Sequence, residues 1–192
     1  MKVRKTTRDA AWLEVALSDT AALLSDHAHC EKKAASSAIS LIARYPEASS
    51  MVTALAALAH EELEHFAEVH AALLTRGGVL GVDVGDPYVQ RLVKLAKGET
   101  RAERIADRLL ISALVEARSF ERLALLGERH PDPALAEMFA RFARTEAQHG
   151  ALFVGLAREH GPSREHVDAR LAELLDREHA IIESHPLRCA IH

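Results

Sequence analysis

The sequence predicts an all-α protein, built as a four-helix bundle with one long crossover and an extra C-terminal helix. The composition favours helix over sheet, because 48% of the 192 residues are hydrophobic, 27% are charged, and only 9 are Gly and 6 are Pro. The residues that break helices gather at a few points and leave long segments between them. We therefore expect a few long helices.

The helices follow in order between these breaks. A short helix is expected before residue 20, and the longer ones span 20–45, 48–76, 99–129, 133–160 and 163–184. The first two long helices, and the next two, are joined by only a few residues, so each pair forms an antiparallel hairpin. The stretch 77–98 is long enough for a crossover. A short connection, a long crossover and a second short connection are the order found in a ferritin-like bundle. We expect one domain over residues 1–192.

Charge and cysteine content exclude several classes of protein. The net charge of -4 argues against a uniformly basic nucleic-acid binder, although a local basic patch stays possible. No secretory signal and no apolar stretch long enough to cross a membrane is found, so we expect no membrane partner. Cys30 and Cys189 form neither a disulfide framework nor a Cys-x-x-Cys site. A cytoplasmic, reducing location fits best, and no phosphate loop or nucleophile elbow is present.

Acidic residues and histidines interrupt the apolar stripes that face the core of the predicted bundle. Steps of three and four residues along the four long helices place two Glu-x-x-His pairs and two further glutamates on these stripes. The six polar core positions are Glu31, Glu62, His65, Glu116, Glu146 and His149.

The spacing within each hairpin brings these residues to one level. Glu31 lies 14 residues before Tyr45, and Glu62 lies 14 residues after Ala48, so equal helix lengths return the chain to the same height. Glu116 and Glu146 have the same spacing from the second turn. All six residues share one layer if the hairpins pack side by side.

Buried carboxylates in a dry core need a compensating charge. Several unpaired carboxylates would each cost several kcal/mol in lost solvation. Metal cations bound between the carboxylates would offset this cost. One Glu from each of two helices and Glu-x-x-His from each of the other two is the ligand pattern of di-iron and di-manganese bundles. By that pattern Glu31 with His65 holds one iron, Glu116 with His149 holds the other, and Glu62 and Glu146 bridge. The alternative is that these are ordinary buried or solvated polar residues.

Longer sequence strings around the same residues carry a family resemblance. They are Asp26-His27-Ala28-His29-Cys30-Glu31-Lys32-Lys33-Ala34-Ala35, Ala59-His60-Glu61-Glu62-Leu63-Glu64-His65-Phe66, Asp107-Arg108-Leu109-Leu110, Glu116-Ala117-Arg118-Ser119-Phe120-Glu121-Arg122 and Glu146-Ala147-Gln148-His149. Over most of its length the chain resembles the MiaE-type tRNA hydroxylases, which are ferritin-like non-haem di-iron monooxygenases. Phe120 departs from the pattern, which usually has a cysteine there, and could change the packing nearby.

The resemblance implies a reaction, a cofactor and partners. The implied reaction hydroxylates the isopentenyl side chain of 2-methylthio-N6-isopentenyladenosine in tRNA with molecular oxygen. The implied cofactor is two iron ions, and the implied partners are tRNA, O2 and a separate electron-donating reductase or carrier, because no flavin, ferredoxin or rubredoxin signature is present. The oligomeric state stays open.

Other residues have competing interpretations. A basic row runs along the start of the third long helix, with further arginines beyond it: Lys97, Arg101, Arg104, Arg108, Arg118, Arg122, Arg141 and Arg144. These residues could neutralise phosphates, but a solvated, ion-paired helix face is the alternative that base rates favour. For His27, His29 and His60 we expect surface or supporting roles rather than metal ligation, and for Cys30 a packing role.

Two other functions use the same sequence features. A ferritin- or rubrerythrin-like ferroxidase or peroxidase would share the six ligands, but a ferritin would assemble into a large shell. A non-enzymatic helical interaction module would bind no metal stoichiometrically, and the layer of carboxylates would then lack compensation.

Overall fold

The computed structural model describes residues 2–192, and within that range the regular elements are all helices. In chain order they are α1 (Asp9–Ala16), α2 (Thr20–Arg44), α3 (Ser49–Leu74), α4 (Pro87–Val93), α5 (Arg101–Arg129), α6 (Pro133–His160) and α7 (Arg164–Glu183). The all-α expectation is confirmed. The five long helices begin and end within two residues of the positions that the sequence predicts.

The sequence prediction missed α4, which lies inside the stretch read as a crossover. Its signal is local: Asp86 is the N-cap, and its Oδ1 accepts the backbone N–H groups of Tyr88 at 2.9 Å and Val89 at 3.2 Å. Pro87 opens the helix, where its fixed φ fits and its missing N–H costs nothing. Seven residues are too few to show a helical period, which is why the pattern was not visible.

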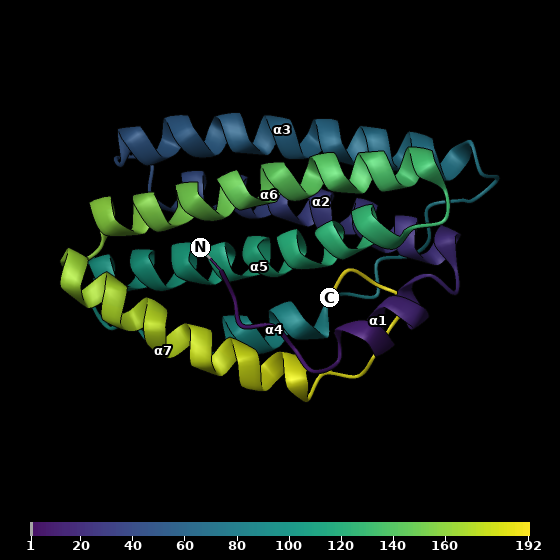
Figure 1. Ribbon diagram of the computed structural model, residues 1–192. Coiled ribbons are helices and arrows are strands. Elements are labelled where there is room, and N and C mark those ends of the chain that lie inside the picture. Colours follow the sequence, from purple (N-terminus) through teal and green to yellow (C-terminus); the bar gives the residue numbers. More distant parts are fainter. Residues whose placement is uncertain (1) are drawn as a thin grey trace. The chain divides into compact units, whose positions relative to one another are not determined.

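The chain divides into two compact units, each built around one hairpin of long helices. The α2–α3 unit comprises residues 14–84 and 188–191, and the α5–α6 unit comprises residues 2–13, 85–187 and 192. The two hairpins are visible as two pairs of long, side-by-side helices in Figure 1. The expectation of a single domain over residues 1–192 stays a prediction.

In the α2–α3 unit, four residues connect the two helices, and Asp19 caps the first by accepting the N–H of Ala22. The buried faces of the two helices include Glu31, Glu62 and His65, as the sequence predicts, and the outer faces are exposed to solvent. The loop after α3 returns to α2, because Ser25 Oγ accepts the N–H of Gly81 at 3.0 Å and His29 Nε2 lies 2.9 Å from the Gly81 carbonyl oxygen.

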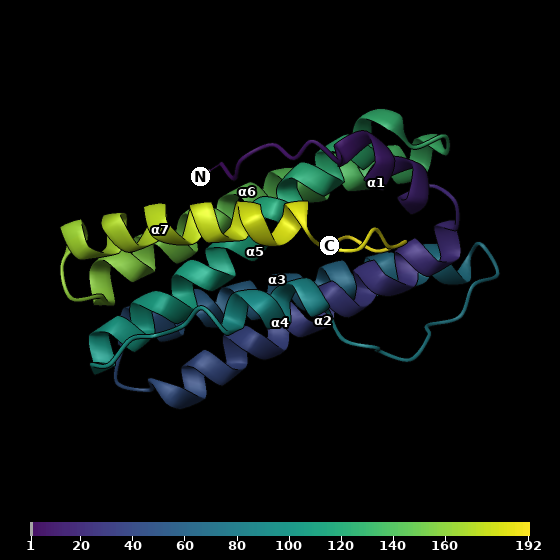
Figure 2. The same cartoon turned by 90° about the horizontal axis from the view of Figure 1, so that it is seen from below.

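In the α5–α6 unit, three residues connect the hairpin, and both helices have strong N-caps. Thr100 forms a capping box with Glu103, and Asp132 accepts the N–H groups of Ala134 and Leu135 ahead of Pro133 at the first turn. The helix α7 lies against α5 and α6, and α4 lies against α5 and α7, as Figures 1 and 2 show. The hairpin therefore has a second layer of helices behind it.

Buried ion pairs join α7 to the rest of this unit. Arg118 of α5 is fully buried and donates from Nε and Nη2 to the two carboxylate oxygens of Glu178, each at 2.9 Å. The hydroxyl of Tyr88 donates to Glu178 Oε1 at 3.0 Å, which ties α4 to the same carboxylate. Near the start of α5, Arg170 Nε donates to Asp107 Oδ1 at 2.7 Å. Two-point pairing of this kind offsets the cost of burying charge.

Candidate metal centre

The α2–α3 unit gathers three of the six predicted ligands. Glu31 comes from α2, and Glu62 and His65 come from one face of α3 at a spacing of three residues. Ligand atoms of all three lie within 4.8 Å of one another. His65 Nδ1 is 3.6 Å from Glu31 Oε2 and 3.5 Å from Glu62 Oε2. The exposed fractions of Glu31, Glu62 and His65 are 4%, 0% and 8%, so the cluster is shielded from water.

The two carboxylates change the acidity of the histidine between them. Burial by itself lowers the pKa of His65, but the hydrogen bonds and negative charges of Glu31 and Glu62 outweigh it and raise the pKa to about 10. The cluster therefore favours a positive charge at its centre. A metal cation in this place would need the imidazole in its neutral form and would take over the role of the proton.

His27 supports the cluster from one turn earlier on α2. Its Nε2 lies 2.6 Å from Glu31 Oε1, and the side chain is 1% exposed. A contact of this kind fixes the orientation of a ligating carboxylate. The expected supporting role of His27 agrees with this geometry. His29 and His60 point elsewhere: His29 contacts Gly81 and Lys32, and His60 is an exposed neighbour of Glu64.

The α5–α6 unit gathers the other three predicted ligands in the same way. Glu116 comes from α5, and Glu146 and His149 come from one face of α6. Their ligand atoms also lie within 4.8 Å of one another, and His149 Nδ1 is 3.7 Å from Glu146 Oε2. The exposed fractions of Glu116, Glu146 and His149 are 6%, 2% and 4%.

One carboxylate oxygen of this second cluster is in surroundings that a bound cation would suit. Glu146 Oε2 is buried and accepts no hydrogen bond within residues 2–192. A buried carboxylate oxygen without a donor loses its hydration without compensation, which costs free energy. A metal ion would supply that compensation, and two carboxylates with one imidazole are suitable donors for iron or manganese. The residues present therefore fit a bound metal.

Each hairpin thus carries a half-site of two glutamates and one histidine. The spacing argument from the sequence is confirmed within each hairpin, because Glu31 meets Glu62 and His65, and Glu116 meets Glu146 and His149. That all six share one layer stays a prediction.

The basic residues divide into two groups. Lys97, Arg101, Arg104 and Arg108 are exposed at the start of α5 and just before it, as are Arg141 and Arg144 on α6. Lys97 Nζ donates to Glu173 Oε1 at 2.8 Å, so one member of the row is ion-paired. The exposed residues remain candidates for contact with phosphate.

Arg118 and Arg122 are buried, so neither phosphate binding nor a solvated helix face describes them, although the expected ion pairing is present. Arg118 is engaged by Glu178, and Arg122 is 2% exposed, donates to Asp9 Oδ1 at 3.2 Å and lies over the ring of Trp12. Burial lowers the pKa of Arg122 to about 10 in spite of Asp9. Both arginines hold the N-terminal segment and α7 in place.

The sequence prediction did not connect Ser119, Asp86 and His192. Ser119 Oγ is 3.0 Å from His192 Nε2, and His192 Nδ1 is 2.9 Å from Asp86 Oδ2. The three residues are far apart in the sequence, so no spacing rule could find them. The only local signal is that Ser119 lies three residues after Glu116, which places both on one face of α5.

Comparison with known proteins identifies the family. The family described as tRNA-(MS[2]IO[6]A)-hydroxylase (MiaE) matches residues 1–192. The chain belongs to this family. The expected resemblance and the expectation of an enzyme are thereby confirmed.

Two relatives support the assignment. A Pseudomonas putida protein named tRNA 2-(methylsulfanyl)-N(6)-isopentenyladenosine(37) hydroxylase is 36% identical over 165 residues, which are 86% of this chain and 78% of that protein. A solved structure described as Protein 43 with aldehyde deformylating oxygenase activity from Synechococcus matches with a TM-score of 0.89 and 36% identity, covering 95% of this chain and 92% of that one. The ferritin-like class of this MiaE-family chain is confirmed. None of its described helices has the length and apolar character needed to span a bilayer.

Proposed function

We propose that this MiaE-family protein is a non-haem di-iron monooxygenase that hydroxylates the isopentenyl group of 2-methylthio-N6-isopentenyladenosine in tRNA. It uses O2 and electrons from a separate reductase or carrier. The observation that carries the proposal is the pair of buried half-sites, each with two glutamates and one histidine, in a chain of a tRNA hydroxylase family.

The six side chains together would hold two iron ions. Glu31 with His65 would bind one iron, Glu116 with His149 would bind the other, and Glu62 and Glu146 would be the further ligands. The bound iron supplies the redox chemistry with O2 that no amino-acid side chain can provide. The chain itself keeps the ligands dry and oriented, since all six are less than 9% exposed.

Protein groups around the ligands would protect the reaction. His27 holds the Glu31 carboxylate through its Nε2, which limits the movement of that ligand. On α6, Phe142 and Phe153 lie one turn on either side of the Glu146–His149 pair and are buried. Aromatic side chains at these positions exclude water, and an apolar surrounding suits an isopentenyl group.

The substrate would be a folded tRNA, as it is for the Pseudomonas putida relative by name. The exposed row Lys97, Arg101, Arg104 and Arg108 offers positive charge for the phosphate backbone. Arg108→Ala should lower tRNA affinity about threefold to tenfold and reduce the slope of log affinity against log salt by about 0.9. Arg164→Ala is a control, because Arg164 is exposed on α7 and pairs with Asp168. If both variants bind tRNA as tightly as the unchanged protein, this row is not part of the interface with tRNA.

The electron donor would be a second protein. Cys30 and Cys189 form no disulfide in the described part of the chain, and a protein that acts on tRNA would work in the reducing cytoplasm.

A second candidate function is oxygenation of an aldehyde, because the Synechococcus protein is as similar in identity as the tRNA hydroxylase relative. A ferroxidase or peroxidase is a further alternative that uses the same ligands.

The test is anaerobic loading with ferrous iron, followed by O2, reductant and tRNA that carries the isopentenylated adenosine. Mass spectrometry of the nucleosides should show a gain of one oxygen, and iron analysis should give about two ions per chain. Glu116→Ala should abolish the gain. Glu128→Ala should not, because Glu128 is exposed on the same helix.

Two results would contradict the proposal. If iron loads and O2 is consumed while the tRNA is unchanged, the tRNA substrate is wrong, and an aldehyde under the same conditions becomes the next assay. If no metal binds stoichiometrically, the di-iron centre itself is wrong.

A further inference from the structure

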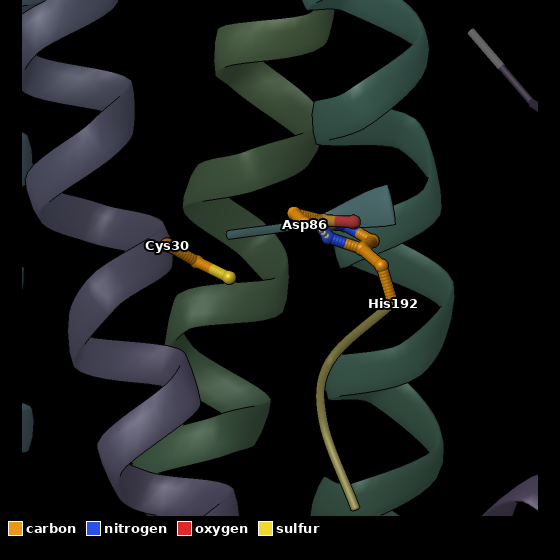
Figure 3. A group of neighbouring side chains, drawn as sticks. All are labelled: Cys30, Asp86 and His192. Atoms are coloured by element: carbon orange, nitrogen blue, oxygen red, sulfur yellow. Dashed lines mark hydrogen bonds and ion pairs between the residues drawn. The ribbon is translucent and has the colours of Figure 1, made fainter. Parts of the chain in front are cut away.

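Three buried side chains form a hydrogen-bonded chain in the α5–α6 unit. Ser119 lies on α5, Asp86 caps α4, and His192 lies in the segment after α7. His192 Nε2 is 3.0 Å from Ser119 Oγ, and its Nδ1 is 2.9 Å from Asp86 Oδ2. Figure 3 shows the His192 ring turned toward the Asp86 carboxylate. The exposed fractions of Ser119, His192 and Asp86 are 8%, 4% and 9%.

The partners fix the protonation pattern of the imidazole. A carboxylate only accepts hydrogen bonds, so Nδ1 of His192 carries a hydrogen and donates it to Asp86. In neutral His192, Nε2 then accepts the hydroxyl hydrogen of Ser119. When His192 gains a second proton, Nε2 becomes a donor to Ser119 Oγ, and the hydroxyl hydrogen of Ser119 is free to turn to another acceptor.

The surrounding residues hold Asp86 and His192 of this hydrogen-bonded chain in one orientation. Asp86 Oδ1 accepts the N–H groups of Tyr88 and Val89, which fixes its carboxylate at the start of α4. The rings of Tyr88 and His192 stack with centroids 5.0 Å apart and planes 22° apart. Asp86 and Tyr88 are the titratable groups in this unit that face the imidazole, and Tyr88 in turn donates to Glu178, which pairs with Arg118.

Ser119 is the member of the hydrogen-bonded chain that lies nearest in sequence to a candidate metal ligand. Ser119 lies three residues after Glu116, so the two side chains are on the same face of α5 and one turn apart. A segment that only needed an anchor could bury an apolar side chain there at no cost in lost hydration. Three polar side chains in its place lose their hydration, and the hydrogen bonds that join them offset this cost.

The same three residue types form the catalytic triad of hydrolases, but the geometry here does not suit a nucleophile. Ser119 lies in the interior of α5, where backbone N–H groups bond to helix carbonyls. Such N–H groups cannot form the oxyanion hole that acyl transfer requires. Transfer of a proton through the Ser119 hydroxyl needs no oxyanion hole.

We propose that Asp86, His192 and Ser119 form a proton relay that serves the α5 side of the metal centre. This inference rests on the proposed function. Hydroxylation converts one C–H group, O2, two electrons and two protons into one alcohol and one water. In each relay step the Nε2–H bond of His192 breaks, a new O–H bond forms at Ser119, and the original O–H hydrogen of Ser119 passes into the site. His192 is left neutral, held by Asp86, and regains a proton that comes from water.

The first test is independent of iron and of activity. Nitrogen NMR of the full chain with labelled histidine should show His192 in the Nδ1–H form, with a slowly exchanging proton. Asp86→Asn should change this tautomer, and Ser119→Ala should shift the Nε2 resonance. An Nε2–H tautomer in the unchanged protein, or an Nε2 resonance that Ser119→Ala does not move, would overturn the relay.

The second test measures O2 uptake by iron-loaded protein with a chemical reductant, in H2O and in D2O. Ser119→Ala should slow uptake by at least about tenfold and change the solvent isotope effect, whereas Ser119→Thr should retain both. Ser112→Ala is the matched control, because Ser112 lies on α5 one turn on the other side of Glu116. Iron content and unfolding midpoint, measured for each variant, separate a relay from a structural role.

The outcomes distinguish this inference from the function on which it rests. If the unchanged protein hydroxylates tRNA and Ser119→Ala matches it in rate and isotope effect, the relay is wrong and the function stands. If the unchanged protein takes up O2 without modifying tRNA, the substrate assignment is wrong, and the isotope effect still decides the relay. If it takes up no O2, the oxygenase function and the relay fall together.

Discussion

The α2–α3 hairpin and the α5–α6 hairpin bury the same ligand types in the same order, yet different groups support them. In the α2–α3 hairpin a buried histidine, His27, contacts Glu31 directly at 2.6 Å. At the corresponding place on α5, four residues before Glu116, stands Ser112. On the α5–α6 side, it is Ser119, one turn after Glu116, that is connected to a histidine. Equal ligand patterns therefore have unequal surroundings.

The two units also differ in how their helices are held. Buried ion pairs such as Arg118–Glu178 and Asp107–Arg170 join α7 to α5. In the α2–α3 unit the ion pairs of Lys32 and Lys33 with Asp83 are partly exposed, with the Lys32 side chain at 44% and the Asp83 side chain at 26%. Since exposed pairs contribute little free energy, ion pairs of Lys and Arg should stabilise the α5–α6 unit more than the α2–α3 unit. The difference indicates that a ligand set can be repeated while its support is specific to each hairpin.

The largest effect should come from removing one ligand in each hairpin. Glu31→Ala and Glu116→Ala should each lower hydroxylation by at least about 100-fold, because loss of a ligand weakens metal binding more than loss of a supporting group. Iron titration and product analysis measure this. If one of the two variants retains full iron content and activity, the two half-sites do not contribute equally.

The second effect concerns stability. Arg118→Met leaves the carboxylate of Glu178 buried without its partner, so the free energy of unfolding should fall by about 3–5 kcal/mol. Lys32→Met in the other unit should change it by less than about 1 kcal/mol, because that pair is partly exposed. Urea unfolding of both variants compares the units directly. Similar losses would mean that burial does not distinguish the two sets of charges.

A smaller effect should come from the group that supports Glu31. His27→Phe keeps the volume but removes the Nε2 contact, so the affinity of one iron ion should fall about 10- to 100-fold. Iron-binding titrations should then resolve one weakened and one unchanged site. Ser112→Ala at the corresponding position should leave both affinities unchanged. If His27→Phe binds both ions normally, His27 is only a packed core histidine.

The smallest effect is a pH dependence from the α5–α6 unit. Burial alone raises the pKa of Asp107, but the bonds from Arg170 and from the N–H groups of Lys97 and Gly98 outweigh it and lower the pKa. The lowered pKa in the folded state means that the stabilisation is fully present above the ordinary pKa of about 4 and is lost as pH falls through the lowered value. Unfolding free energies measured from pH 6 to pH 2 should fall less steeply in Asp107→Asn. Identical curves would remove Asp107 as a source of acid sensitivity.

Much of each half-site could be predicted from the sequence, because local geometry decides it. Glu62 with His65, and Glu146 with His149, share a face through helical spacing alone. The short turns at 45–48 and 130–132 then fix which residues of the neighbouring helix lie opposite them. By contrast, α4 was missed because it has too few residues to show a helical period. Arg118 and Arg122, which were expected at the surface, are buried in the interior.

The sequence by itself determined the long helices, their pairing into hairpins and the members of each half-site, since these follow from the helical repeat and the length of a turn. Only the tertiary structure decided that Arg118 and Arg122 are buried, that Glu178 reaches Arg118 and Tyr88, and that His192 reaches both Ser119 and Asp86. Ser119 and His192 are 73 residues apart, and Asp86 and His192 are 106 apart. No local repeat relates residues at such separations. The path of the chain after α7 brings them together, and that path is set by long-range packing and buried hydrogen bonds.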